Sequence, residues 1–172
     1  MKKAFTLIEM MIAISIFAIV SLFLYKSYYS LNQSNLKYEE LLKKSEKFNK
    51  IKKTIYLDFT LALSSDISIL NQEKIEDVVL FQTTNSIHNR INPYVGYIIK
   101  DKTLYRIESL NKLTYPLDAE LDADVDKIAK VKRFRVYKAL KKINSFSKTL
   151  YLVDIIFENG NRILYKIDSL NN

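Results

Sequence analysis

The sequence has no cysteine, and its 172 residues include only two glycines, two prolines and one histidine. The lack of cysteine excludes disulfide bonds, cysteine-ligated zinc sites and thiol catalysis. With so little glycine and proline, the chain has no glycine-rich phosphate loop, flexible linker or low-complexity tract. His88 lies in a polar stretch with no recognisable nucleophile nearby, and one histidine alone does not make a familiar zinc site. We therefore expect no enzymatic activity.

The longest apolar run, residues 5–25, lies near the N-terminus, and 17 of its 21 residues are apolar. As a helix it would be about 31 Å long, enough to cross a hydrocarbon core of about 30 Å. Secretory signal peptides have a shorter apolar region and a small-residue cleavage site, which is missing after Phe23. The run therefore predicts a membrane span, and Lys2 and Lys3 before it indicate a cytoplasmic N-terminus.

Glu9 is the only charged residue inside this run. An ionised side chain within a span costs on the order of 2–3 kcal/mol. A residue with that cost usually has a partner, so we expect a cation at a similar depth.

The segment from Lys3 to Ala13, KAFTLIEMMIA, resembles the class III leader of type IV pilins and type II secretion pseudopilins. The resemblance implies that a prepilin peptidase cuts between Ala4 and Phe5 and methylates the new amino group of Phe5. It also supplies a cation, because the Phe5 ammonium of the same or a neighbouring subunit could pair with Glu9. The family usually has glycine where this chain has Ala4.

The length and the resemblance divide the chain into a leader (1–4), a transmembrane helix (5–25), a periplasmic continuation of that helix (26–63) and a head domain (64–172). Apolar residues spaced by three, four or seven positions support the continuation, because they form one face of a helix. These residues are Leu41, Phe48, Ile51, Ile55, Phe59 and Ala62.

From residue 64 the apolar residues alternate or form short runs, which is typical of strands. Asp101-Lys102 and Asn159-Gly160 predict tight turns between antiparallel strands. The predicted fold is therefore α+β, a long N-terminal helix packed on an antiparallel sheet as in pilins. We expect strands at residues 77–83, 95–100, 103–109, 131–140, 149–158 and 162–169.

Acidic residues occupy every second position from 118 to 126: Asp118, Glu120, Asp122, Asp124 and Asp126. Oxygen ligands on one side of an extended segment could hold Ca²⁺, and some pseudopilins bind calcium in a C-terminal loop. An EF-hand loop starting at Asp122 would need glycine at position 127 and glutamate at 133, where the chain has Lys127 and Arg133. We therefore expect a solvated acidic edge and no cofactor, with a calcium site as the alternative.

The next segment, residues 127–148, contains nine lysines or arginines and no acid, in a chain of formal net charge +8. Alternation along a strand would place Arg133 and Arg135 on one face and Phe134 and Val136 on the other. A solvated or subunit-facing strand is the first interpretation. Binding of DNA phosphates or anionic lipids, and neutralisation by the neighbouring acidic run, are the alternatives.

Together these features predict a non-enzymatic minor pilin or pseudopilin in a short periplasmic filament of a type II secretion-like system. The resemblance implies three partners: the prepilin peptidase and methylase, other pilins or pseudopilins, and an inner-membrane assembly platform. It implies a single-pass protein of the bacterial inner membrane with a periplasmic head. Residues 92–108 loosely resemble a hairpin of J-class minor pseudopilins. The alternative is a minor pilin of a type IV pilus or competence system that binds DNA through residues 127–148.

Overall fold

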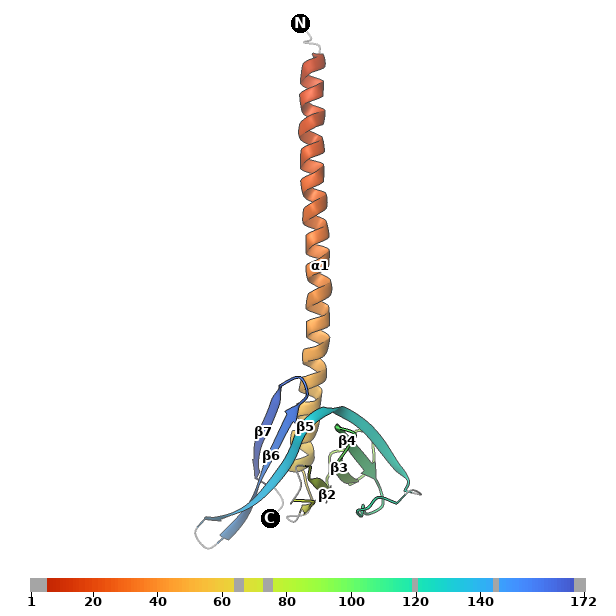
Figure 1. Cartoon of the computed structure of the whole chain (residues 1–172), viewed down its shortest axis with the longest axis vertical. Coiled ribbons are helices and arrows are strands. Elements are labelled where there is room, and N and C mark those ends of the chain that lie inside the picture. Colours follow the sequence, from red (N-terminus) through yellow and green to blue (C-terminus); the bar gives the residue numbers. More distant parts are fainter. Residues whose placement is uncertain (1–5, 64–66, 73–75, 119–120, 144–145, 169–172) are drawn as a thin grey trace. The chain divides into compact units, whose positions relative to one another are not determined.

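The computed structural model describes residues 6–63, 67–72, 76–118, 121–143 and 146–168, without the side chains of residues 140–143 and 146–148. The described residues form one helix and seven strands (Figure 1). In chain order these are α1 (Leu7–Thr60), β1 (Ser68–Leu70), β2 (Val78–Gln82), β3 (Tyr94–Lys100), β4 (Thr103–Ser109), β5 (Ala123–Ile143), β6 (Phe146–Phe157) and β7 (Arg162–Asp168).

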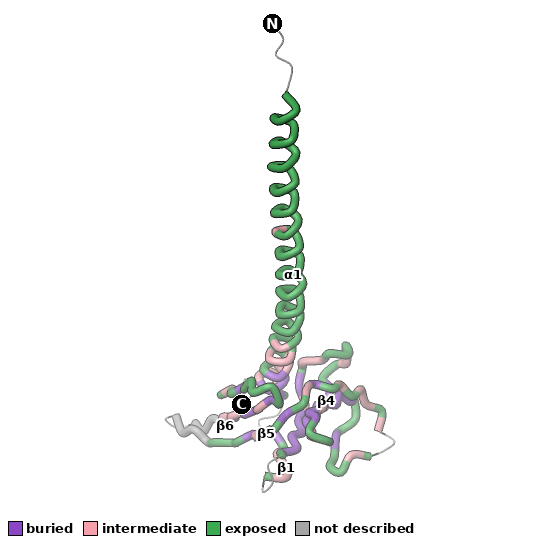
Figure 2. Tube along the Cα trace, turned by 45° about the horizontal axis from the view of Figure 1, so that its top comes forward, coloured by how far each residue is buried: buried purple, intermediate pink, exposed green. Residues whose placement is uncertain are grey.

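Helix α1 is 54 residues long and continuous, as expected for a segment without proline or glycine. The chain forms two compact units, and the boundary at Phe48 falls inside this helix. In the first unit almost every described residue of α1 is exposed (Figure 2). The second unit contains the last three turns of α1 together with the sheet.

The strands form one antiparallel sheet whose spatial order, β1 to β7, follows the chain. Asp101 and Lys102 connect β3 to β4 with φ values of 51° and 57°, the left-handed conformation of a two-residue hairpin turn. Between β6 and β7, Gly160 has φ 86° and its N–H donates to the Phe157 carbonyl at 3.1 Å. Both predicted turns are confirmed.

Strand β5 differs most from the prediction. It begins at Ala123 rather than at residue 131, and its first part pairs with β4. After a register irregularity between Val131 and Arg133, the same strand pairs with β6. The alternating acids of residues 122–126 concealed this start, although their period of two is itself a strand pattern. The short strand β1 was also not predicted.

The core of the head lies between the end of α1 and the sheet. Ile55, Phe59 and Ala62 are fully buried. The Phe59 ring lies 4.9 Å from that of Phe81 and 5.9 Å from that of Tyr97, measured between centroids. These contacts confirm the α+β fold with a helix on an antiparallel sheet. The predicted apolar face is buried only at its C-terminal end, since Leu41 is exposed.

Candidate functional site

Thr6 and Glu9 form a reciprocal capping box at the start of α1. The backbone N–H and the hydroxyl of Thr6 donate to Oε2 of Glu9 at 2.9 and 2.8 Å. In return, the Glu9 N–H lies 3.4 Å from Oγ1 of Thr6. This arrangement satisfies N–H groups that have no partner within the helix. The sequence signal was Thr-x-x-Glu, which our sequence reasoning missed because it treated Glu9 only as a charge.

The Glu9 carboxylate keeps one oxygen for another partner. Both bonds from Thr6 end on Oε2, and no donor among residues 6–63 or the other described ranges reaches Oε1. Ala4 and Phe5, the predicted cleavage and methylation site, lie outside the described residues. The pairing of Glu9 with the Phe5 ammonium therefore stays a prediction.

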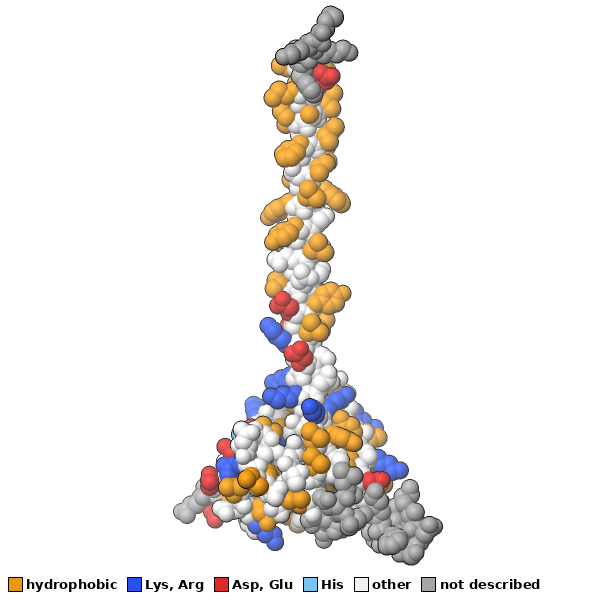
Figure 3. All heavy atoms as spheres, turned by 180° about the vertical axis from the view of Figure 1, so that it is seen from behind, with side chains coloured by type: hydrophobic (Ala, Val, Ile, Leu, Met, Phe, Trp, Pro, Cys, Tyr) orange, Lys and Arg blue, Asp and Glu red, His pale blue; other side chains and the backbone are white. Residues whose placement is uncertain are grey.

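The first half of α1 exposes its apolar side chains (Figure 3). Its most apolar stretch of 18 residues has a mean hydropathy of 2.6, and none of that stretch is buried. Tyr25, Tyr28 and Tyr29 follow it, and all three are exposed. Tyrosine rings are enriched at membrane–water interfaces, where an apolar ring and a polar hydroxyl are both accommodated. By length and composition, this part of α1 can cross a membrane.

Residues 1–25 match the family model described as the prokaryotic N-terminal methylation motif. This chain carries the class III prepilin leader of type IV pilin-like proteins and pseudopilins. None of the curated proteins matches the chain. The resemblance proposed for the leader is thus confirmed over residues 1–25. The match ends before the head, so it does not distinguish secretion, pilus and competence systems.

Side chains of the acidic run lie close to cations of the head. Oδ2 of Asp126 lies 2.8 Å from Nε2 of His88. Oδ2 of Asp124 lies 2.9 Å from both Nε and Nη2 of Arg90, whereas Asp122 is exposed and lies 3.9 Å from Nη2. These carboxylates are therefore partly neutralised within the head.

The calcium alternative has no support from this geometry. Within the described ranges, no group of three His, Asp or Glu side chains could hold a metal ion. Glu120 lies outside the described residues, and Asp118 is exposed. The expected solvated edge without a cofactor stays a prediction, and calcium binding stays its alternative.

Arg133 and Arg135, the candidate DNA contacts, also have partners inside the head. Arg133 donates to the buried Asp154 carboxylate. Nε of Arg135 lies 3.3 Å from the buried Asp77 carboxylate, and its Nη2 donates to the Gln72 carbonyl at 2.8 Å. The two arginines are thus neutralised by acids outside the run at 118–126.

The opposite face of this part of β5 is apolar, as predicted. Phe134 and Val136 are both buried.

Asp154, on β6, accepts hydrogen bonds from Arg162 and Arg133. Burial opposes ionisation of Asp154, but these two guanidinium groups together lower its pKa.

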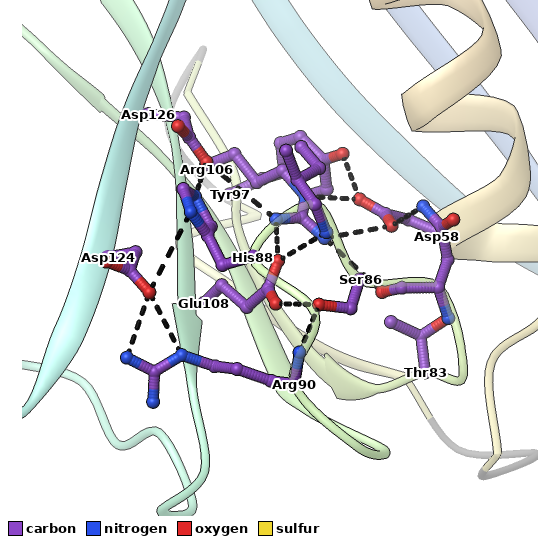
Figure 4. A network of polar contacts seen from close by, with 12 residues as sticks. Asp58, Thr83, Ser86, His88, Arg90, Tyr97, Arg106, Glu108, Asp124 and Asp126 are labelled. Atoms are coloured by element: carbon purple, nitrogen blue, oxygen red, sulfur yellow. Dashed lines mark hydrogen bonds and ion pairs between the residues drawn. The ribbon is translucent and has the colours of Figure 1, made fainter.

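A second site, which our sequence reasoning missed, is a charged network inside the head (Figure 4). Arg106 of β4 is fully buried and contacts Asp58 of α1, with Nε–Oδ2 and Nη2–Oδ1 distances of 2.7 and 3.1 Å. Its Nη1 donates to Glu108, two residues further along β4. Tyr97 of β3 donates its hydroxyl to Asp58 at 2.5 Å.

The network keeps its charges because they are paired. Burial alone would lower the pKa of Arg106, but the hydrogen bonds and charge of Asp58 raise it. Burial also opposes ionisation of Glu108, but hydrogen bonds from Ser86 and Arg106 lower its pKa. The network joins the last turns of α1 to the sheet through charge-assisted hydrogen bonds.

Proposed function

We propose that this chain is a minor pilin or pseudopilin, a structural subunit of a short filament in a type II secretion-like system. The methylation motif at residues 1–25 carries the proposal, because it joins a processing site to a membrane-spanning helix. The proposed location is the inner membrane, with the N-terminus in the cytoplasm and the head in the periplasm. The proposed partners are the prepilin peptidase, other subunits of the filament and the membrane assembly platform.

The capping box supports a specific role for Glu9 in assembly. Thr6 holds Oε2, so the carboxylate is already oriented when a second donor approaches Oε1. The methylated ammonium of Phe5, on the same or a neighbouring subunit, would be that donor. A charge pair of this kind is strong inside a membrane, because the surroundings screen it little. Pairing would also offset the cost of placing Glu9 among lipid tails.

Intact mass spectrometry of the membrane-inserted protein tests the processing step. We expect the protein to lose the mass of residues 1–4 and to gain the mass of one methyl group. In cells without the prepilin peptidase, the full mass starting at Met1 should remain. An intact Met1 in cells with an active peptidase would contradict the proposal.

Deletion of the gene for this chain distinguishes the proposed role in secretion from the alternative role in DNA uptake. We expect export of folded substrate proteins to stop, while DNA uptake continues. The internal pairing of Arg133 and Arg135 supports this choice, since arginines held by Asp154 and Asp77 are less available to phosphates. Loss of DNA uptake with normal export would favour the competence alternative instead.

A further inference from the structure

The loop of residues 83–93, between β2 and β3, contacts a face of the head that is rich in carboxylates (Figure 4). In the register of β4 and β5, Arg106 lies opposite Asp126 and Glu108 lies opposite Asp124. Residues that face each other across two strands project on the same side of a sheet. The second pair brings together two like charges, which is destabilising unless cations are nearby.

The loop supplies those cations. Without the loop, Arg106 is the one cation among the described residues that contacts this group of carboxylates. It binds Asp58 and Glu108 and lies 3.9 Å from Asp126, but it has no contact with Asp124. Arg90 of the loop binds Asp124. His88 binds Asp126 through Nε2, and its Nδ1 lies 3.9 Å from Asp124. When His88 is protonated, the four carboxylates face three cations; when it is neutral, they face two.

Hydrogen bonds to the same face fix the path of the loop. The Ser86 hydroxyl and the Ile87 N–H both donate to Glu108, the latter at 3.0 Å. The Arg90 N–H then donates to Oγ of Ser86 at 2.7 Å. The loop backbone is therefore sensitive to the charge balance on β4 and β5.

We propose that His88 is a pH-sensitive clasp, which fastens this loop to β5 as an imidazolium and loosens it as a neutral imidazole. His88 is the only histidine of the chain, and histidine is the side chain that ordinarily changes charge between about pH 5 and 8. Its side chain is 31% exposed, so it can exchange protons with solvent. Among the described residues, the charged groups around it are Arg106 and Glu108 of β4, Asp124 and Asp126 of β5, and Arg90 of the loop itself.

The sign of the effect follows from linkage. The hydrogen bond with Asp126 raises the pKa of His88, against a smaller opposing effect of burial. A group whose pKa is higher in the folded state stabilises that state fully below its unfolded value, about 6.5 for histidine. This contribution is lost as the pH rises through the higher folded value. The contact of the loop with β5 is therefore strengthened at acidic pH and weakened at alkaline pH.

Hydrogen exchange of the full-length protein in detergent micelles tests the clasp. We expect the protection factors of the Ile87 and Arg90 amides to be about two- to fivefold lower at about pH 8 than at about pH 5.5. A change of this size corresponds to the loss of one partly exposed ion pair. The Gly160 amide, in a turn without histidine, is the internal control. Protection factors already correct for the intrinsic pH dependence of exchange.

Two variants separate the clasp from a general effect of pH. In His88→Gln the loop should show equally low protection at both pH values, and in His88→Arg it should show high protection at both. The imidazole resonance of the single histidine should titrate at a lower pH in Asp126→Asn than in the wild type. Unchanged wild-type protection between the two pH values, or an equal change in His88→Gln, would overturn the proposal.

Discussion

Replacing Arg106 by methionine is expected to destabilise the head by about 3–5 kcal/mol, the usual cost of removing one partner from a buried ion pair. Methionine fills a similar volume, but it leaves Asp58 and Glu108 buried without their common cation. Urea unfolding of the full-length protein in detergent, followed by near-ultraviolet circular dichroism of the tyrosines, measures the loss.

Arg162→Met is the matched control. Arg162 also pairs with a buried acid, but it is half exposed and Arg133 contacts the same Asp154 carboxylate. We expect a much smaller loss there, because solvent screens the charge of an exposed guanidinium group. Adding Asp58→Asn and Glu108→Gln to Arg106→Met should recover part of the stability, because both unpaired charges are removed. Equal losses for the two arginine variants would contradict the role assigned to the network.

Replacing Glu9 by valine is expected to improve the anchor and impair the filament. Valine removes the cost of a charge in the span, so membrane insertion should be at least as efficient. Loss of one charge-assisted hydrogen bond should reduce incorporation into filaments about tenfold to a hundredfold. Sheared filaments and membranes are compared by quantitative immunoblotting.

Glu9→Gln and Thr6→Ser separate the two roles of this site. Glutamine can still complete a capping box but carries no charge, so assembly should fall nearly as far as with valine. Serine keeps the cap, so assembly should remain normal. Normal assembly of Glu9→Val would show that the proposed pairing with the Phe5 ammonium is wrong, whatever the outcome for Thr6.

Local features of the fold were predictable, whereas contacts between distant segments were not. The continuous helix follows from the absence of breakers, and the turns at residues 101–102 and 159–160 follow from residues that tolerate positive φ. The start of β5 was missed because acids on one face of a strand look like a solvated loop. The sequence also does not reveal that these acids face His88 and Arg90, more than 30 residues away.

The candidate sites show the same contrast between local features, which were predictable, and distant contacts, which were not. The motif of the leader was recognisable from a few consecutive residues, and its family match covers the same region. The buried network was invisible, because Asp58 and Arg106 are 48 positions apart and each looks like an ordinary surface charge in its own segment. Only the pairing of α1 with β4 explains why two charged residues can lie in a core.

The chain-ordered sheet has a consequence for how the head is made. Each strand from β2 onward pairs with the strand immediately before it. During synthesis, every new strand therefore meets a partner that has already left the ribosome, and no strand waits for a later one to fill a gap. Pairings between neighbours in sequence also close short loops, which favours rapid folding. A chain without disulfide bonds can thus complete its sheet strand by strand, with few unpaired strand edges exposed during folding.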